Sequence, residues 1–128
     1  MKTLNCDIVT VQLKPSVIRE DLAVIGVIVR CDETGYSGFR LIDAEGERVK
    51  ELDLFFRGYG IDNIRQAVAW AEGDIRFAIE REKCPDGKGA FANLIRPREN
   101  VVRYGKVRSA IATDPEKLLA EEYGKLVE

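Results

Sequence analysis

Histidine is missing from this chain of 128 residues, and its absence removes several kinds of chemistry. Neither a Ser-His-acid triad nor a Cys-His pair can form, and the commonest general base near neutral pH is lost. The three cysteines, Cys6, Cys31 and Cys84, form no C-x-x-C pair, so a zinc site would need cysteines and carboxylates alone. We therefore expect reduced thiols that behave as small buried hydrophobic side chains, and no cofactor.

Long apolar segments are also missing. Residues 1–6 lack the apolar run of a signal peptide, and the run at residues 22–29 is far shorter than the ~20 residues of a membrane span. Basic and acidic residues number 20 and 22, which gives a net charge of -2 and no overall attraction to nucleic acid or anionic membranes. No linker or repeat divides the chain. We expect a cytoplasmic protein with one domain over residues 1–128.

The apolar run at residues 22–29 is rich in Val and Ile and predicts a central strand buried on both faces. Gly26 in its middle indicates a bulge or a close approach of other atoms. Residues 7–14 alternate, with Val9, Val11 and Leu13 on one side, and predict a strand with one buried face. A loop at residues 17–21 and a third strand at 39–43 complete an antiparallel meander.

Two more strands are predicted at residues 101–104 and 107–112, and helices are expected between and after the strands. Residues 49–56 predict a short helix, and Asp62 is expected to cap a longer one. That longer helix has an apolar stripe and is expected to break near residues 72–74, at Gly73. Residues 90–95 predict a helical turn, and residues 113–116 begin a closing helix. The predicted fold is α+β, an antiparallel sheet of about four to five strands with helices packed mainly on one face.

Basic residues are concentrated in one segment near the C-terminus, with Glu99 as the single acid among them. They can grip phosphates or an acidic partner, because Arg matches phosphate and carboxylate oxygens. The alternative is a solvated surface, and Arg103 and Arg108 need not point the same way. The segment comprises Arg96, Arg98, Arg103, Tyr104, Lys106 and Arg108.

A second candidate partner site consists of the aromatic residues Phe55, Phe56 and Tyr59. The more common alternative is that these side chains form part of the core under a short helix. Residues 87–89 read Gly-Lys-Gly but lack the remainder of a phosphate loop, so they indicate a turn. Four carboxylates could serve a metal or acid–base site, but their spacing matches no nuclease pattern and favours an exposed helix end. They are Asp74, Glu80, Glu82 and Asp86.

The order of these segments resembles a bacterial family catalogued as domain of unknown function 3037. The likeness lies in Gly26 and Val27 of the central strand, in residues 94–100, and in Asp114 and Pro115 at the start of the closing helix. Ala23 and Val24 depart from the family, which usually has an aromatic residue and Asn there. The resemblance implies no activity or site, but it does imply genes that often stand beside HipA-like kinases.

These observations favour a non-catalytic interaction module that works with a protein partner, such as a HipA-like kinase. A nucleic-acid-associated protein using residues 96–108 is the alternative, and a metal-dependent enzyme is the third hypothesis. A homodimer through a free sheet edge stays open.

Overall fold

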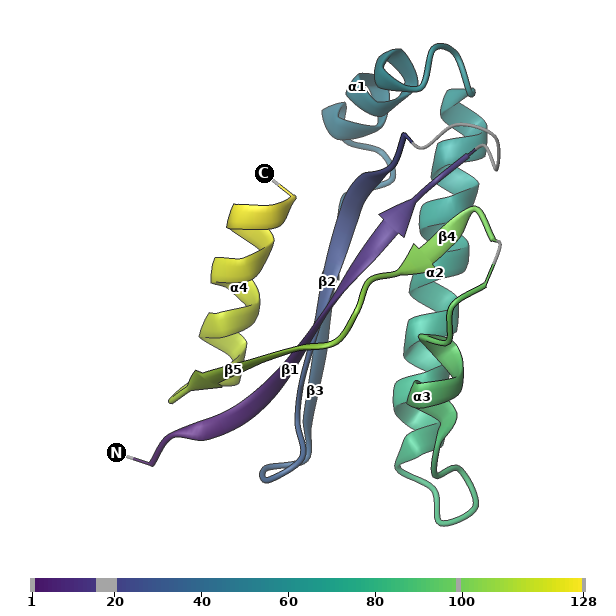
Figure 1. Cartoon of the computed structure of the whole chain (residues 1–128). Coiled ribbons are helices and arrows are strands. Elements are labelled where there is room, and N and C mark those ends of the chain that lie inside the picture. Colours follow the sequence, from purple (N-terminus) through teal and green to yellow (C-terminus); the bar gives the residue numbers. More distant parts are fainter. Residues whose placement is uncertain (1, 16–20, 99, 128) are drawn as a thin grey trace.

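The computed structural model describes residues 2–15, 21–98 and 100–127, which form an antiparallel sheet and four helices (Figure 1). The loop expected at residues 17–21 lies mostly outside the described residues, as does Glu99. The strands are β1 (Leu4–Leu13), β2 (Ala23–Cys31), β3 (Tyr36–Leu41), β4 (Val102–Tyr104) and β5 (Arg108–Ala112). The predicted α+β class is confirmed.

The sheet has the order β3-β2-β1, and β4 and β5 follow one another along the remaining edge of β1. The first three strands form the predicted meander, with short connections and antiparallel pairing. The chain therefore adds its last two strands to the first one. Both β1 and β2 lie inside the sheet, so the central position is shared by two strands.

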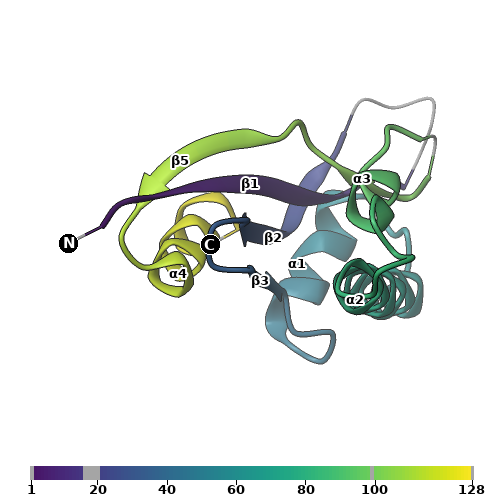
Figure 2. The same cartoon turned by 90° about the horizontal axis from the view of Figure 1, so that it is seen from below.

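The helices divide between the two faces of the sheet. On β3, Phe39 lies under the guanidinium of Arg76, 5.2 Å away, whereas Arg40 lies over the ring of Tyr123, 4.4 Å away. Adjacent strand residues point to opposite faces, so the helices that carry Arg76 and Tyr123 cover opposite faces. These helices are α2 (Ile61–Glu82) and α4 (Pro115–Leu126), seen on either side of the strands in Figure 2.

The other two helices lie toward α2. α3 (Ala90–Leu94) packs on α2, and α1 (Glu47–Phe55) contacts α2 at one end of the sheet. The sequence led us to expect helices mainly on one face. That holds for α2 and α3, but α4 covers the other face, as a strand buried on both faces requires.

Strand β1 changes its buried face along its length. Val9, Val11 and Leu13 are buried as predicted, but Leu4, Cys6 and Ile8 are buried too. Ile8 pairs with Val29 on the α4 side, and Val9 pairs with Ile28 on the α2 side. The expectation of a single buried face was therefore wrong, because two helices cover the two halves of this strand from opposite sides.

Gly26 of β2 is packed against its neighbouring strand. The pairing of β1 with β2 shifts in register between Val11 and Gln12, beside this glycine. A Cβ atom on Gly26 would lie 2.7 Å from the carbonyl oxygen of Arg40 and would clash with the side chain of Leu41. Both readings of this glycine, an irregularity in the strand and a close approach, are confirmed.

Helix α2 runs without a break through Gly73, contrary to the sequence-based expectation. A helix-interior glycine costs only ~1 kcal/mol, and the buried residues on both sides of it, from Ile64 to Ile79, hold the helix together. Asp62 does not cap this helix; Gly60 precedes its first residue, and Asp62 lies in the first turn. For α4 the predicted start is confirmed, since Asp114 accepts hydrogen bonds from the amides of Glu116 and Lys117.

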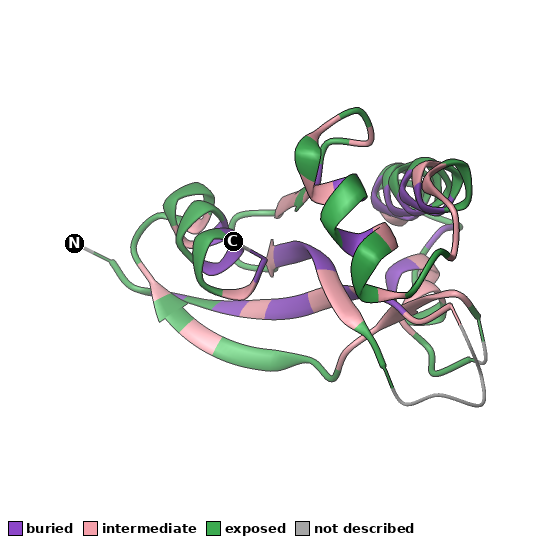
Figure 3. Ribbon diagram, turned by 90° about the horizontal axis from the view of Figure 1, so that it is seen from above, coloured by how far each residue is buried: buried purple, intermediate pink, exposed green. Residues whose placement is uncertain are grey.

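The buried side chains form a hydrophobic core around β1 and β2, while β5 beside them is mostly exposed (Figure 3). Two cysteines, Cys6 and Cys31, are buried in this core, whereas Cys84 is exposed and departs from the expectation. Burial raises the pKa of Cys6, and hydrogen bonding with Thr34 lowers the pKa of Cys31. Across the described residues, no helix combines the length and the apolar composition that crossing a membrane demands.

Candidate interaction groove

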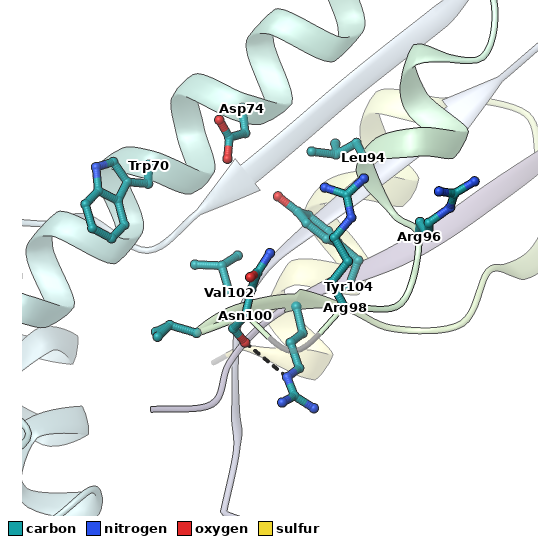
Figure 4. Close-up of a pocket in the computed structure, with 10 residues that line it drawn as sticks. Trp70, Asp74, Leu94, Arg96, Arg98, Asn100, Val102 and Tyr104 are labelled. Carbon is teal, nitrogen blue, oxygen red and sulfur yellow. Dashed lines mark hydrogen bonds between the residues drawn. The ribbon is translucent and has the colours of Figure 1, made fainter. Parts of the chain in front are cut away.

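A cavity of about 340 Å³ opens between α2 and the segment that leads into β4 (Figure 4). We call it the α2–β4 groove. Trp70 and Asp74 of α2 form one wall, and the segment from α3 to β4 forms the other. Its lining residues are Trp70, Asp74, Leu94, Arg96, Arg98, Asn100, Val101, Val102, Arg103 and Tyr104.

Helical spacing explains the α2 wall. Trp70 and Asp74 are four residues apart, so they lie one above the other on one face of the helix. The buried stripe that includes Ala71 and Ile75 is turned toward the core, which leaves Trp70 58% exposed. An exposed Trp is unusual, since such a large ring normally gains from burial.

The opposite wall is fixed by β4 and by an arginine. Tyr104 pairs with Val11 of β1, which directs its ring toward α2. Arg98 donates hydrogen bonds to the backbone oxygen of Asn93, at 2.9 Å, and to its side-chain oxygen, at 3.1 Å. These bonds tie the connection after α3 to the end of that helix and hold the wall in place.

Tyr104 is an ionisable group of the groove whose pKa is shifted. Burial, with a smaller contribution from the negative charge of Asp74, raises its pKa to about 12. The phenol is therefore neutral at physiological pH and serves as a hydrogen-bonding group on an otherwise apolar ring. Together with Trp70, Leu94 and Val102, it forms the apolar part of a lining that also holds charged and polar side chains.

The basic segment is divided by the fold. Arg96 and Arg98 are exposed and line the groove (Figure 4). Arg103 also lines it, but it pairs with Gln12, so its side chain leaves β4 on the opposite face from that of Tyr104. The Nε atom of Arg103 donates to the backbone oxygen of Asn100 at 3.0 Å. The six residues of the segment therefore do not form one surface.

The remaining two cations of the segment lie outside the groove. Arg108 is in β5, on the α4 face, and its guanidinium is 3.3 Å from the buried carboxylate of Glu122. Lys106 is exposed in the connection between β4 and β5. The sequence left open whether Arg103 and Arg108 point the same way; by register both lie on the face opposite α2, whereas Tyr104 lies on the α2 face. The partner of Arg108 carried no signal in the sequence.

The aromatic candidates lie apart from the groove residues. Phe55 and Phe56 meet edge to face, with ring centroids 4.9 Å apart. Phe56 and Tyr59 are half-buried and pack against the core, as the more common alternative supposed, whereas Phe55 is 53% exposed. None of the three lines the α2–β4 groove.

Sequence reasoning missed Trp70 as a site residue, and it considered Asp74 only as a carboxylate for a metal or acid–base site. The signal was present, because Trp70 falls beside the apolar stripe of α2 and not within it. That offset predicts an exposed ring, and only the fold shows that the ring faces β4. Leu94 and Val102 carried no comparable signal, since apolar residues at element ends are common.

Two of the four carboxylates considered for a metal or acid–base site make structural contacts. Glu82 accepts hydrogen bonds from the amides of Gly89, at 3.0 Å, and Phe91, at 3.3 Å, and so holds the start of α3. Asp86 pairs with Arg81 at 3.3 Å. Within residues 2–15, 21–98 and 100–127, no three Cys or carboxylate side chains are grouped so that they could hold a metal ion.

A second hollow of about 640 Å³ lies between β3 and α2. It is larger than the groove, but four of its charged side chains are engaged with one another. Arg76 binds Glu72 at 3.1 Å and covers Phe39, and Lys83 is 3.8 Å from Glu80. The α2–β4 groove, with its exposed Trp70, offers more exposed apolar surface to a ligand and is the stronger candidate for a binding site.

Comparison with known proteins identifies the family without assigning a function. Searches of curated proteins and of solved structures each found no match. A family model described as "Protein of unknown function (DUF3037)" matches residues 9–127, which cover both walls of the groove and every strand except the start of β1. The chain therefore belongs to the DUF3037 family.

Proposed function

We propose that this chain is a non-catalytic interaction module that binds a protein partner through the α2–β4 groove. The observation that carries the proposal is the exposed indole of Trp70 beside Leu94 and Val102 in a concave site. Trp, Tyr and Arg dominate the energetics of protein interfaces, and the groove combines all three. Exposed apolar surface in a concavity is also typical of binding sites.

The chemistry of the groove indicates what the partner presents. Arg96 and Arg98 in its lining favour carboxylates, and the apolar lining residues favour a large hydrophobic side chain. An acidic segment with one aromatic or aliphatic anchor meets both requirements. The family resemblance implies a first candidate, a HipA-like kinase, because genes of the family are expected to stand beside such kinases.

The test uses two exposed aromatic residues seven positions apart on α2. Trp70 lines the groove, whereas Phe77, 69% exposed, does not and provides a matched control. Partners are captured from the native host with the wild type, Trp70→Ala and Phe77→Ala, and the recovered protein is then purified and titrated directly. We expect Trp70→Ala to weaken binding at least about tenfold, since an anchor residue contributes roughly 2 kcal/mol.

Three outcomes would contradict the proposal. The first is a partner that binds Trp70→Ala as tightly as the wild type. The second is recovery of nucleic acid alone, with affinity that falls steeply as salt is added; this would favour the nucleic-acid alternative. The third is turnover of a substrate by the purified chain, which would make it an enzyme.

A further inference from the structure

Strand β5 forms an open edge of the sheet. It pairs with β1 on one side, and no described strand lies on its other side (Figures 2 and 3). Ile111 in this strand is 69% exposed. Proteins usually protect such edges with Lys, Pro or a covering segment, because unpaired backbone groups attract another strand.

The pairing of β1 shows which backbone groups of β5 face outward. The amide of Lys14 donates to the oxygen of Val101 at 2.7 Å, and the amide of Gly105 donates to the oxygen of Thr10 at 3.0 Å. Even-numbered residues of β1 therefore direct their backbone groups toward the β4–β5 edge. Asn5, an odd-numbered residue of β1, is consistent with this alternation because its amide points to the opposite edge, toward the β2–β3 turn.

This alternation continues along β1 into its pairing with β5. Cys6 and Ile8 pair with Ala110 and Arg108, so these two residues of β5 direct their backbone groups inward. Ser109 and Ile111 then present their N–H and C=O groups outward. The two outward residues flank Ala110, the middle residue of the strand, and this arrangement is self-complementary.

We propose that the chain forms a two-fold homodimer in which β5 pairs antiparallel with β5 of a second copy, with Ala110 on the axis. In this register Ser109 lies opposite Ile111 of the second copy, and Ile111 lies opposite its Ser109. Each pair exchanges two backbone hydrogen bonds, and the two Ile111 side chains approach diagonally on one face. The same patch serves both copies, as a two-fold interface requires.

Charge is compatible with this pairing. Arg108 is the only charged residue of β5, and its guanidinium is engaged with Glu122 on the α4 face. In the proposed register Arg108 lies opposite Ala112 of the second copy, which is small. No like charges meet directly across the interface, and Ala110 at the axis permits the close approach of a pair without hydrogen bonds.

Two variants test the interface by disrupting it. Ser109→Pro removes an outward amide and no hydrogen bond to β1, and Ile111→Lys places a charge on the edge. Sedimentation equilibrium over a concentration series should show a dimer for the wild type and a monomer for both variants. Leu54→Lys, at a residue 80% exposed on α1, is the matched control and should stay dimeric. Circular dichroism confirms that each variant is folded.

Cross-linking tests the register. Ser109→Cys and Ile111→Cys are each made with Cys84→Ser, so that no other exposed cysteine competes. Directly opposite residues have Cα atoms about 5.5 Å apart, within disulfide range. The mixture of the two variants should form a covalent dimer faster than either alone. A wild type that stays monomeric, a dimer that persists in Ser109→Pro and Ile111→Lys, or equal cross-linking in all samples would overturn the proposal.

Discussion

Replacing Gly26 and Gly73 with alanine should change the free energy of unfolding in opposite directions. At Gly26 the new methyl group meets the carbonyl oxygen of Arg40 at 2.7 Å and the Cα of Leu41 at 3.3 Å. The Leu41 side chain can rotate away, but the Arg40 oxygen belongs to the backbone of β3 and can move only with that strand. Overpacking of this kind costs about 1–3 kcal/mol, which outweighs the ~0.5–1 kcal/mol gained by replacing glycine.

Gly73 provides the matched comparison. It lies inside α2, and a Cβ atom there would have no neighbour within 4 Å. Gly73→Ala should stabilise the protein by about 1 kcal/mol through helix propensity alone. For a chain of this length each kcal/mol corresponds to roughly 3–5 °C in Tm.

Thermal unfolding followed by circular dichroism, together with urea unfolding, measures both effects. We expect Gly26→Ala to lower Tm and Gly73→Ala to raise it, with unchanged dependence of the unfolding free energy on urea. A Gly26→Ala protein as stable as the wild type would show that β3 can move away from the new methyl group without loss of unfolding free energy. Changes in Tm of the same sign in both variants would refute the argument from the space around each glycine.

Other expected outcomes concern the groove and two helix starts. The raised pKa of Tyr104, about 12 against about 10 when unfolded, means that the unfolded chain loses its proton first. The neutral phenol therefore contributes at most about 2 kcal/mol to the free energy of unfolding below pH ~10, and this contribution is lost as pH rises toward ~12. Free energies of unfolding measured across alkaline pH should lack this loss in Tyr104→Phe. Asp74→Asn should lower the pKa of Tyr104 in an ultraviolet titration of the phenol, because it removes a negative charge. Asp114→Ala should cost about 1 kcal/mol in urea unfolding, since it removes the cap of α4. Glu82→Ala should reduce hydrogen-exchange protection at the start of α3, whereas unchanged protection would show that its contacts to those amides are weak.

The sequence predicted the strands well because their signals are local. The apolar run around Gly26 and the alternation of Val9, Val11 and Leu13 each specify a strand without reference to the remainder of the chain. The start of α4 was equally local, since Asp114 and Pro115 act within one turn. The helix break predicted at Gly73 was wrong because the free-energy cost of a glycine inside a helix is small compared with the stabilisation from the packing of α2. No local sequence pattern shows that packing.

The site was less predictable because it depends on which elements meet. Arg96, Arg98 and Tyr104 were identified as candidates, but they were grouped with Arg108, which the fold places on the α4 face. Trp70 was missed as a groove residue because its significance comes from the approach of β4, about thirty residues further along the chain. Sequence position thus identified part of one wall of the groove and not its opposite wall.

The late addition of β4 and β5 to β1 has a consequence during synthesis. β1 ends at Leu13 and β4 begins at Val102, so the ribosome makes about 90 residues between them. At roughly 5–20 residues per second, one edge of β1 has no neighbouring strand for about 4–18 seconds. Throughout that interval the nascent chain carries an apolar strand with unpaired backbone groups. A stalled or truncated product that ends before β4 would keep that edge exposed, which makes such fragments candidates for aggregation and for capture by chaperones.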